Sequence, residues 1–193
     1  MRSWHKPRCQ SQADRGSRPI EQEATKMQHV GQGEHAVSDN PLVVLSTLLG
    51  SCVSTCMFDP LAKVGGLNHM VLPNDSSNDP FDLMTQVNAM ECLINALLKS
   101  GAVRSRLVAK VFGGARMIGS SAAVGEKNAE FVLSFLSDEG IPVESQDLGG
   151  TQARRIRFEP TTGRVQLKLV TDRPIEPIIA APKPPAASGL ELF

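Results

Sequence analysis

Cys52 stands where a chain readily presents a reactive side chain. It follows Gly50 and Ser51 at the end of the apolar run 42–45. A buried strand that stops at a Gly-Ser pair exposes the residue that comes next. A free thiol at that position can act as a nucleophile.

A nucleophilic cysteine needs a base beside it, because only a few per cent of a thiol with the ordinary pKa of about 8.5 is ionised at neutral pH. His69 lies 17 residues after Cys52, on the neighbouring predicted strand, and a sheet can bring the two within reach of each other. Backbone N–H groups around Gly50 and Ser51 can then hold a developing oxyanion. The remaining histidines are less suited because they precede the first predicted strand: His5, His29 and His35.

The same residues also allow interpretations without catalysis. Cysteine is often buried as a small apolar side chain, and a histidine on an apolar face is often a structural residue with satisfied hydrogen bonds. A metal site on Cys52 and Cys56 is disfavoured, because zinc needs four ligands and the chain has no second pair at suitable spacing. Gly113-Gly114 lacks the Lys-Ser or Lys-Thr of a P-loop and is interpreted as a tight strand exit. Catalysis and a structural role both stay open on these grounds.

The composition excludes a strong overall electrostatic field. The chain has 193 residues with 20 Lys and Arg against 20 Asp and Glu, so its total charge attracts neither nucleic acid nor an anionic membrane. No apolar run approaches the roughly 18 to 20 residues of a membrane span, and residues 1–8 lack the apolar core of a signal peptide. We therefore expect a cytoplasmic protein with free thiols, no nucleic-acid partner and no membrane insertion.

Apolar patterning predicts the elements that position Cys52 and His69. A long helix is expected from Pro80 to Ser100, with Asp79 as its N-cap, apolar side chains at spacings of three and four, and a stop at Gly101. A second helix is expected over 126–139. The predicted strands are 42–48, 53–58, 63–73, 107–112, 141–148, 153–159 and 164–170, with a turn at Thr161-Thr162-Gly163 before the last. This pattern predicts an α/β or α+β fold.

The chain is expected to hold one domain between two tails. Residues 1–28 are polar without apolar periodicity, which is typical of a disordered N-terminal tail. Residues 29–172 form the predicted domain. Residues 173–193 are rich in Pro and Ala and are expected to form a disordered C-terminal tail.

Several motifs occur in an order that resembles one protein family. They include Leu49-Gly50-Ser51-Cys52-Val53, Asp59-Pro60, Lys63 to His69, Leu72-Pro73, Phe112-Gly113-Gly114-Ala115, Gly125 to Asn128, and Asp147-Leu148-Gly149-Gly150 with Arg154 to Phe158. Together they span roughly residues 30–169, and the chain resembles the CheD family of chemoreceptor glutamine deamidases. The resemblance implies a layered α/β sandwich with a mixed sheet, similar to the catalytic domain of cytotoxic necrotising factor toxins.

The resemblance also implies an activity and its site. Family members hydrolyse selected glutamine side-chain amides on the helical cytoplasmic region of methyl-accepting chemotaxis receptors, without metal or organic cofactor, and some bind a CheC-type phosphatase. The family's nucleophile falls on Cys52, its general base on His69 and its third, hydroxyl-bearing position on Ser46. Thr47 is expected to face the other side of a regular strand, so it takes the orienting role only through a bulge.

Two other functions fit the same residues. A degenerate member of the family can bind receptors or a CheC-type phosphatase without doing chemistry. A receptor methylesterase can use the same Cys52 and His69 with methanol in place of ammonia as the leaving group. The sequence also leaves open which receptor glutamines are chosen.

Overall fold

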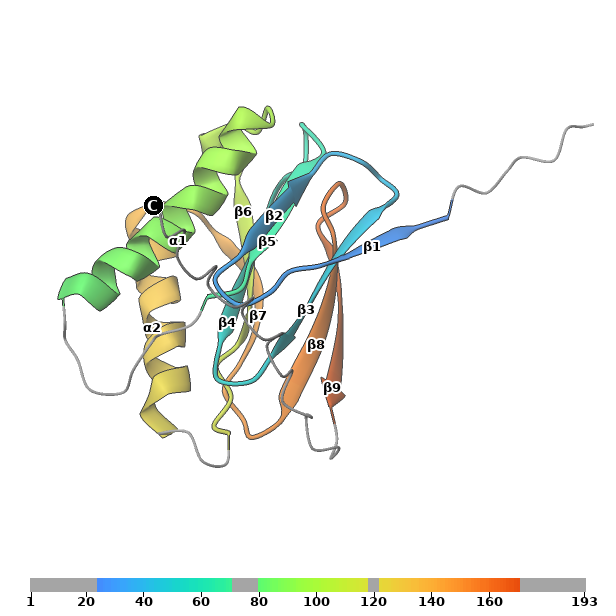
Figure 1. Cartoon of the computed structure of the whole chain (residues 1–193). Helices are drawn as coiled ribbons and strands as arrows, with labels where there is room; N and C mark the ends of the chain where they lie inside the picture. Colours follow the sequence, from blue (N-terminus) through green and yellow to red (C-terminus); the bar gives the residue numbers. More distant parts are fainter. Residues whose placement is uncertain (1–23, 71–79, 118–121, 171–193) are drawn as a thin grey trace, which may run out of the picture.

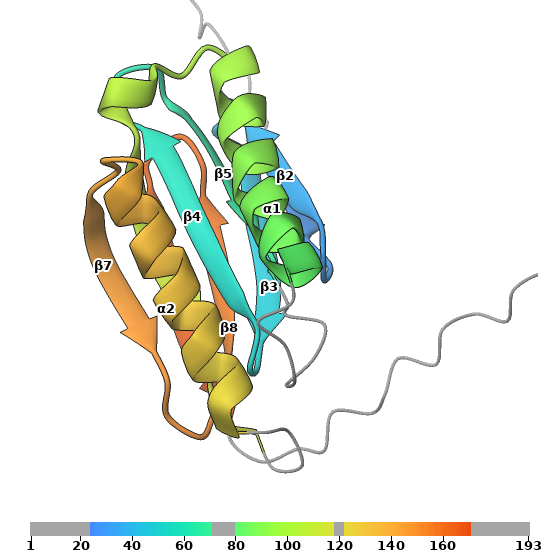
Figure 2. The ribbon, with the colours of Figure 1, turned by 90° about the vertical axis from the view of Figure 1, so that its left-hand side faces the viewer.

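Three layers make up the described part of the chain, which comprises residues 24–70, 80–117 and 122–170 of the computed structural model (Figure 1). A four-stranded sheet packs against a five-stranded sheet, and two helices cover the other side of the five-stranded sheet (Figure 2). This arrangement confirms the predicted layered α+β sandwich, with both sheets mixed.

The four-stranded sheet, called sheet A below, has the order β1-β3-β8-β9. Its strands are β1 (Lys26–His29), β3 (Val43–Leu49), β8 (Ala153–Glu159) and β9 (Arg164–Val170). β1 runs parallel to β3 and the other pairs are antiparallel. β1 pairs only with the first part of β3, up to Ser46, so one edge of β3 is uncovered from Thr47 onward.

The five-stranded sheet, called sheet B below, has the order β2-β5-β4-β6-β7. Its strands are β2 (His35–Ser38), β4 (Val53–Asp59), β5 (Val64–Asn68), β6 (Val108–Gly113) and β7 (Val143–Leu148). β4 lies at the centre and is buried along its whole length. Its alternate side chains therefore serve two different cores.

One core lies between the two sheets and the other lies under the helices. The inter-sheet core contains Leu45, Leu49, Phe58, Leu67, Phe112, Ile156 and Phe158. The core between sheet B and the helices contains Met57, Met90, Leu93, Ile94, Leu97, Val111 and Leu136. Cys52 and Cys56 belong to the inter-sheet core.

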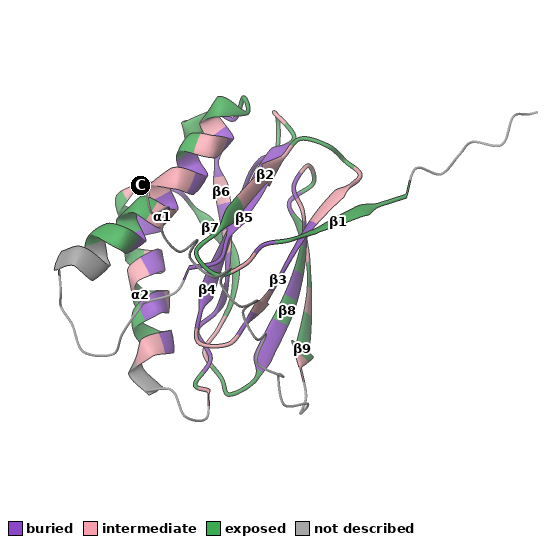
Figure 3. Ribbon diagram, in the orientation of Figure 1, coloured by how far each residue is buried: buried purple, intermediate pink, exposed green. Residues whose placement is uncertain are grey.

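The helices cover sheet B only. α1 (Pro80–Lys99) contacts β2 and β5, and α2 (Ala122–Asp138) contacts β4 and β6. Each is followed two residues later by a glycine of positive φ, Gly101 at 97° and Gly140 at 66°, and the predicted stop at Gly101 is confirmed. The apolar stripe of α1 is not buried along its whole length, although its spacing predicts that it is: near the start of the helix, Met84 is 71% exposed and Val87 is 36% exposed. Figure 3 shows that this beginning of α1 extends past the sheet.

Most predicted elements are confirmed within a few residues, but β1 and β2 were not predicted. β1 contradicts the expectation that residues 1–28 form a disordered tail, because Lys26 begins a strand. All four side chains of β1 are exposed, so the strand leaves no apolar alternation in the sequence. The rest of that tail up to residue 23, the C-terminal tail from residue 173 and the predicted N-cap Asp79 lie outside the described residues.

Candidate active site

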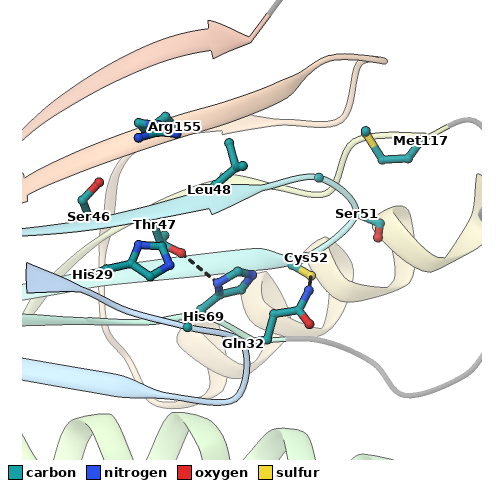
Figure 4. A pocket seen from close by; sticks show the side chains of 12 residues that line it. His29, Gln32, Ser46, Thr47, Leu48, Ser51, Cys52, His69, Met117 and Arg155 are labelled. Atoms are coloured by element: carbon teal, nitrogen blue, oxygen red, sulfur yellow. Dashed lines mark hydrogen bonds between the residues drawn. The ribbon is translucent and has the colours of Figure 1, made fainter. Parts of the chain in front are cut away.

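A cavity of about 620 Å³ lies at the uncovered edge of β3, where the chain turns from sheet A into sheet B (Figure 4). Cys52 and His69 both line it, from the β3–β4 loop and from the residue after β5. The other lining residues are His29, Gly31, Gln32, Ser46, Thr47, Leu48, Gly50, Ser51, Met117 and Arg155. The structure therefore gathers all the residues predicted for the site around one cavity.

The loop that carries Cys52 is held by its carbonyl groups. Gly50 O accepts from Ala115 N at 2.8 Å, and Cys52 O accepts from Gly114 N at 2.8 Å. Between them, Ser51 O accepts from Asn128 Nδ2 at 3.0 Å. Three successive carbonyls thus point toward the β6–α2 side and away from the cavity.

The direction of these carbonyls fixes the direction of the intervening N–H groups. In a trans peptide the N–H points opposite to the C=O of the same plane. The N–H groups of Ser51 and Cys52 therefore face the cavity, and neither has a backbone acceptor among the described residues. Two such N–H groups beside a nucleophile can hold an oxyanion. Gly50 is also predicted for this role, but in the structure it is the carbonyl of Gly50 that is used, as the acceptor of the hydrogen bond from Ala115 N.

Gly113 is required for this loop arrangement. Its φ of 119° is unfavourable for other residues, and a Cβ at this position would overlap the carbonyl oxygen of Cys52. β6 can approach the nucleophile loop this closely only because the side chain is missing. The interpretation of Gly113-Gly114 as a tight strand exit is confirmed, and its effect is to support Cys52.

The imidazole of His69 is held by Thr47. Thr47 Oγ1 lies 2.7 Å from His69 Nδ1 and 2.8 Å from the carbonyl oxygen of Val30. A carbonyl can only accept, so the single hydroxyl hydrogen goes to Val30 and the hydroxyl oxygen accepts from Nδ1–H. We therefore assign the proton to Nδ1. Nε2 then carries a free lone pair, and it is buried with no hydrogen-bond partner among the described residues.

Ser46 lies next to Thr47 but does not contact the imidazole, contrary to the prediction. Its hydroxyl donates to the carbonyl of Ile156 at 2.9 Å. Thr47 takes the place beside His69 without a bulge, since the pairing of β3 with β8 is continuous from Leu45 to Leu49. The physical reason is strand alternation: Leu45 and Leu49 point into the inter-sheet core, so Thr47 between them points the same way and Ser46 points oppositely (Figure 4).

Burial shifts the pKa values of both reactive groups toward the neutral form. Burial raises the pKa of the Cys52 thiol, while hydrogen bonds from Gln32 and the cysteine's own backbone N–H lower it in part. Burial also lowers the pKa of His69, a change that the Val30 carbonyl opposes and the neighbouring His29 increases. Desolvation disfavours the charged form of each group. These shifts favour a thiol and a neutral imidazole with one open nitrogen over an ion pair.

Gln32 is a site residue that sequence reasoning missed. Its side-chain Nε2 donates to Cys52 Sγ at 3.5 Å. Among the described residues, no hydrogen bond joins Sγ to His69 Nε2. The loop of Gln32 is attached to the backbone of His69, through Gly33 N to His69 O at 2.8 Å and His69 N to Glu34 O at 2.9 Å. The only signal in the sequence was the pair of flanking glycines, which indicates a turn but no partner.

The described residues contain no group of three or more His, Cys, Asp or Glu side chains that could hold a metal ion. Cys56 lies fully buried in the inter-sheet core, where burial raises the pKa of its thiol, and it does not line the cavity that contains Cys52.

A cavity that unites a cysteine, a hydrogen-bonded histidine and inward N–H groups is typical of enzymes that use a cysteine nucleophile. The family model described as CheD chemotactic sensory transduction matches residues 71–169. A protein of Cereibacter sphaeroides, named probable chemoreceptor glutamine deamidase CheD, is 50% identical over 149 residues, which are 77% of this chain and 75% of that protein. A protein of the same name from Agrobacterium fabrum is 46% identical over 178 residues, 88% of this chain and 98% of its own length. The chain belongs to the CheD family.

The hypothetical protein YfiH of Bacillus licheniformis is a solved structure that overlaps this one in part. The TM-score is 0.43 at 13% sequence identity, over 65% of this chain and 61% of that chain.

In the described part of the chain, neither helix is both long and apolar enough to cross a membrane.

Proposed function

We propose that this protein is a chemoreceptor glutamine deamidase, which converts glutamine side chains of methyl-accepting chemotaxis receptors to glutamate and releases ammonia. Family membership supports the activity, since the relatives above carry that name. The observation in this chain that carries the proposal is the chain of hydrogen bonds from His69 through Thr47 to Val30. It leaves the lone pair of Nε2 open in the same cavity as Cys52.

The reaction begins with proton transfer from Cys52 to His69. The substrate carboxamide displaces the Gln32 amide from Sγ, and Nε2 accepts the thiol proton as Sγ attacks the carboxamide carbon. The negative charge that develops on the carboxamide oxygen is held by the N–H groups of Ser51 and Cys52. The imidazolium that forms is stabilised through Nδ1–H by the hydroxyl of Thr47.

The second half of the reaction regenerates the enzyme. The imidazolium donates its proton to the departing nitrogen, the C–N bond breaks, and ammonia leaves behind a thioester on Cys52. His69 then accepts a proton from water, whose oxygen attacks the thioester carbon. The C–S bond breaks, glutamate is released, and the thiolate takes back its proton. The steps use only a thiol, an imidazole and water.

The substrate belongs to the helical cytoplasmic region of the receptor, so the protein would act in the cytoplasm. A CheC-type phosphatase is a further partner, which the family resemblance implies. Such a protein would compete with receptors if it covers the same cavity.

The test is to incubate the full-length protein with the cytoplasmic fragment of a chemoreceptor from the same genome. We expect ammonia release in proportion to the number of glutamines that mass spectrometry of the digested fragment finds converted to glutamate. A receptor fragment that stays unchanged would contradict the proposal. Release of methanol from a methylated fragment, without ammonia from the amide form, would instead identify a methylesterase.

A further inference from the structure

The outer face of sheet A carries a row of unpaired cations. Arg155 and Arg157 on β8 and Lys168 on β9 are exposed, and Arg155 lies directly opposite Lys168 across the two strands. Among the described residues, none of the three has an ion pair or a side-chain hydrogen bond. Arg164, farther along β9, differs because it is paired with Glu159. In Figure 3, bands of exposed residues alternate with more buried bands along β8 and β9.

This cationic face is continuous with the candidate active site. Arg155 lines the cavity that contains Cys52, and it also lines a groove of about 270 Å³ together with Arg157 and Lys168. Its neighbour on β3 is Leu48, which lines the same cavity. Figure 4 shows Arg155 and Leu48 on the opposite side of β3 from His69. The cavity thus opens at the edge of β3 onto the outer face of sheet A.

Helices do not compete for this surface in the described part of the chain. α1 and α2 contact strands of sheet B, and both lie on the far side of the molecule from β8 and β9 (Figure 1). The chain as a whole has no net charge. A row of three unpaired cations beside the reactive groups is therefore a local feature and not the result of a basic composition.

We propose that the cationic face of Arg155, Arg157 and Lys168 docks an acidic helical segment of the substrate, whose target glutamine enters the cavity at Cys52. The proposal rests on the proposed function, which supplies the helix and the glutamine. Arg binds carboxylates through a planar pair of N–H donors, and Lys adds a mobile point charge. An acidic partner would neutralise three side chains that have no ion pair among the described residues.

The distance between the two arginines on β8 agrees with the distance between carboxylates one turn apart on a helix. Arg155 and Arg157 are two residues apart on one face of a strand, a separation of about 6.6 Å. Carboxylates four residues apart on a helix are separated by about 6 Å along its axis. A helix lying along β8 can therefore place one carboxylate on each arginine. The target glutamine would then follow one or two turns further along, at the cavity that Arg155 also lines.

A nucleic acid fits this surface less well. Stable binding to a duplex commonly uses about six to ten phosphate contacts, whereas this face offers three unpaired cations. Half-buried Val44 and Leu48 also lie on the outer face of β3, and apolar side chains suit the apolar side of a helix better than a phosphate backbone. The face is therefore assigned to an acidic protein segment.

A binding experiment tests the docking apart from the chemistry. The full-length chain with Cys52→Ala is titrated against two labelled helical peptides that each carry one glutamine. One peptide has glutamates one turn apart beside the glutamine, and the other has alanines there. We expect about tenfold tighter binding of the acidic peptide, equivalent to about 1.4 kcal/mol from two exposed charge pairs. The preference should vanish in about 1 M salt, where charges are screened over about 3 Å.

Variants that remove two positive charges at different places show which surface causes the preference for the acidic peptide. In the Cys52→Ala background, Arg157→Gln with Lys168→Gln should abolish the preference for the acidic peptide. Lys99→Gln with Lys127→Gln removes the same charge from exposed positions on the two helices and should retain it. A preference that survives in the first double variant would overturn the proposal. Tighter binding of a DNA duplex than of the acidic peptide would overturn it as well.

Kinetics with the active enzyme separates this proposal from the proposed function. With the receptor fragment as substrate, Arg157→Gln with Lys168→Gln should raise KM about tenfold and leave kcat unchanged. Unchanged KM would overturn the docking proposal while the deamidase stands. Failure of the unmodified enzyme to deamidate the fragment, with the peptide preference intact, would overturn the proposed function while the docking surface stands.

Discussion

Asp59 and His69 are buried polar side chains at opposite ends of sheet B, and they differ in how completely they are bonded. Both oxygens of Asp59 accept hydrogen bonds, at distances between 2.7 and 3.1 Å, from the backbone N–H groups of Leu61, Ala62 and Val103 and from the guanidinium of Arg106. His69 is bonded at Nδ1, but its Nε2 has no partner among the described residues.

The two environments shift the pKa values by different causes. The guanidinium of Arg106, with help from three backbone N–H groups, holds the pKa of Asp59 well below its usual range in spite of burial. Burial itself lowers the pKa of His69 and so favours the neutral ring. A buried charge with every bond satisfied stabilises a fold. A buried neutral ring with one open nitrogen is instead available for proton transfer.

The largest effect is expected at the nucleophile. Cys52→Ala should lower kcat for deamidation by about 10⁴-fold or more, because no other described thiol lines the cavity, and should change the free energy of unfolding by about 1 kcal/mol or less. Mass spectrometry of the receptor fragment and urea denaturation measure the two quantities. Cys56→Ala is the matched control: this thiol is fully buried in the same core, does not line the cavity and should be dispensable for activity. Continued deamidation by Cys52→Ala would exclude Cys52 as the nucleophile.

The opposite pattern, a loss of stability without a loss of activity, is expected at Asp59, whose two oxygens both accept hydrogen bonds. Asp59→Asn should lower the free energy of unfolding by about 3 kcal/mol, since an amide nitrogen would replace the Oδ2 that accepts from Val103 N and Arg106 Nη2. The kcat of the folded fraction should not change. Glu159→Gln, which breaks the more exposed pair with Arg164, should cost less than about 0.5 kcal/mol. Equal losses from the two variants would show that the bonds to Asp59 do not carry its effect.

Adjacent hydroxyls on β3 test which residue orients the imidazole. Thr47→Val preserves shape and removes the acceptor for Nδ1–H, so kcat should fall about 100-fold, whereas Thr47→Ser should retain most activity. Ser46→Ala should leave kcat within about twofold and lower the free energy of unfolding by about 1 kcal/mol through loss of its bond to Ile156. Steady-state kinetics with ammonia as the readout distinguishes them. A larger loss of kcat for Ser46→Ala than for Thr47→Val would return the orienting role to Ser46.

The two buried groups should also lose their stabilising effects in different pH ranges. The folded-state pKa of His69 is lowered, so below about pH 6.5 the unfolded chain takes up a proton before the folded chain does, and stability falls. Asp59 also has a lowered pKa, and its contribution, complete above about pH 3.9, is lost as the pH falls through its folded-state value. Unfolding free energies measured from pH 7 to pH 3 should show both decreases. His69→Gln should remove the first and Asp59→Asn the second; an unaltered profile in either variant would contradict the assignment.

The smallest effect concerns Gln32, the donor to the nucleophile. Gln32→Leu keeps the volume of the side chain and removes the hydrogen bond to Sγ, so the pKa of Cys52 should rise further. At fixed pH we expect alkylation of Cys52 by iodoacetamide to slow about three- to tenfold, as for loss of one hydrogen bond. Peptide mapping reports the alkylation rate at Cys52, and the alkylation rate at Cys92 serves as the internal reference. Faster alkylation would mean that Gln32 acts mainly by covering the thiol.

The sequence predicted the elements that have clear apolar spacing or turn residues at their ends, and it missed the two short strands β1 and β2. The helix ended by Gly101 and the hairpin turn at Thr161 to Gly163 combine apolar spacing with turn residues, and both are confirmed. β1 has four exposed side chains, and β2 is equally short. Both form because their backbones pair with strands distant in sequence, and pairing of this kind leaves no pattern in the residues themselves.

The site was predicted in its chemistry and mispredicted in one position. The types and order of residues, a cysteine after Gly-Ser and a histidine on a nearby strand, were enough to predict a thiol and an imidazole around one cavity. The choice between Ser46 and Thr47 was not accessible in the same way, because β3 has apolar residues on both faces: Val44 and Leu48 on one, Leu45 and Leu49 on the other. A strand without alternation does not reveal which face will be buried.

What the sequence determined by itself was therefore local: the cysteine and the histidine proposed as nucleophile and base, the glycines that let the backbone approach, and the strands and helices with clear apolar patterns. The tertiary structure alone decided which hydroxyl supports His69, that the Gln32 amide meets the thiol, and that Arg155 joins the cavity to a cationic face. Each of these depends on two strands or loops from distant parts of the chain and on which side of a sheet packs inward. Which face of a strand points inward is decided by the packing of the two sheets and the helices together, because shifting one strand by a single residue would exchange its two faces.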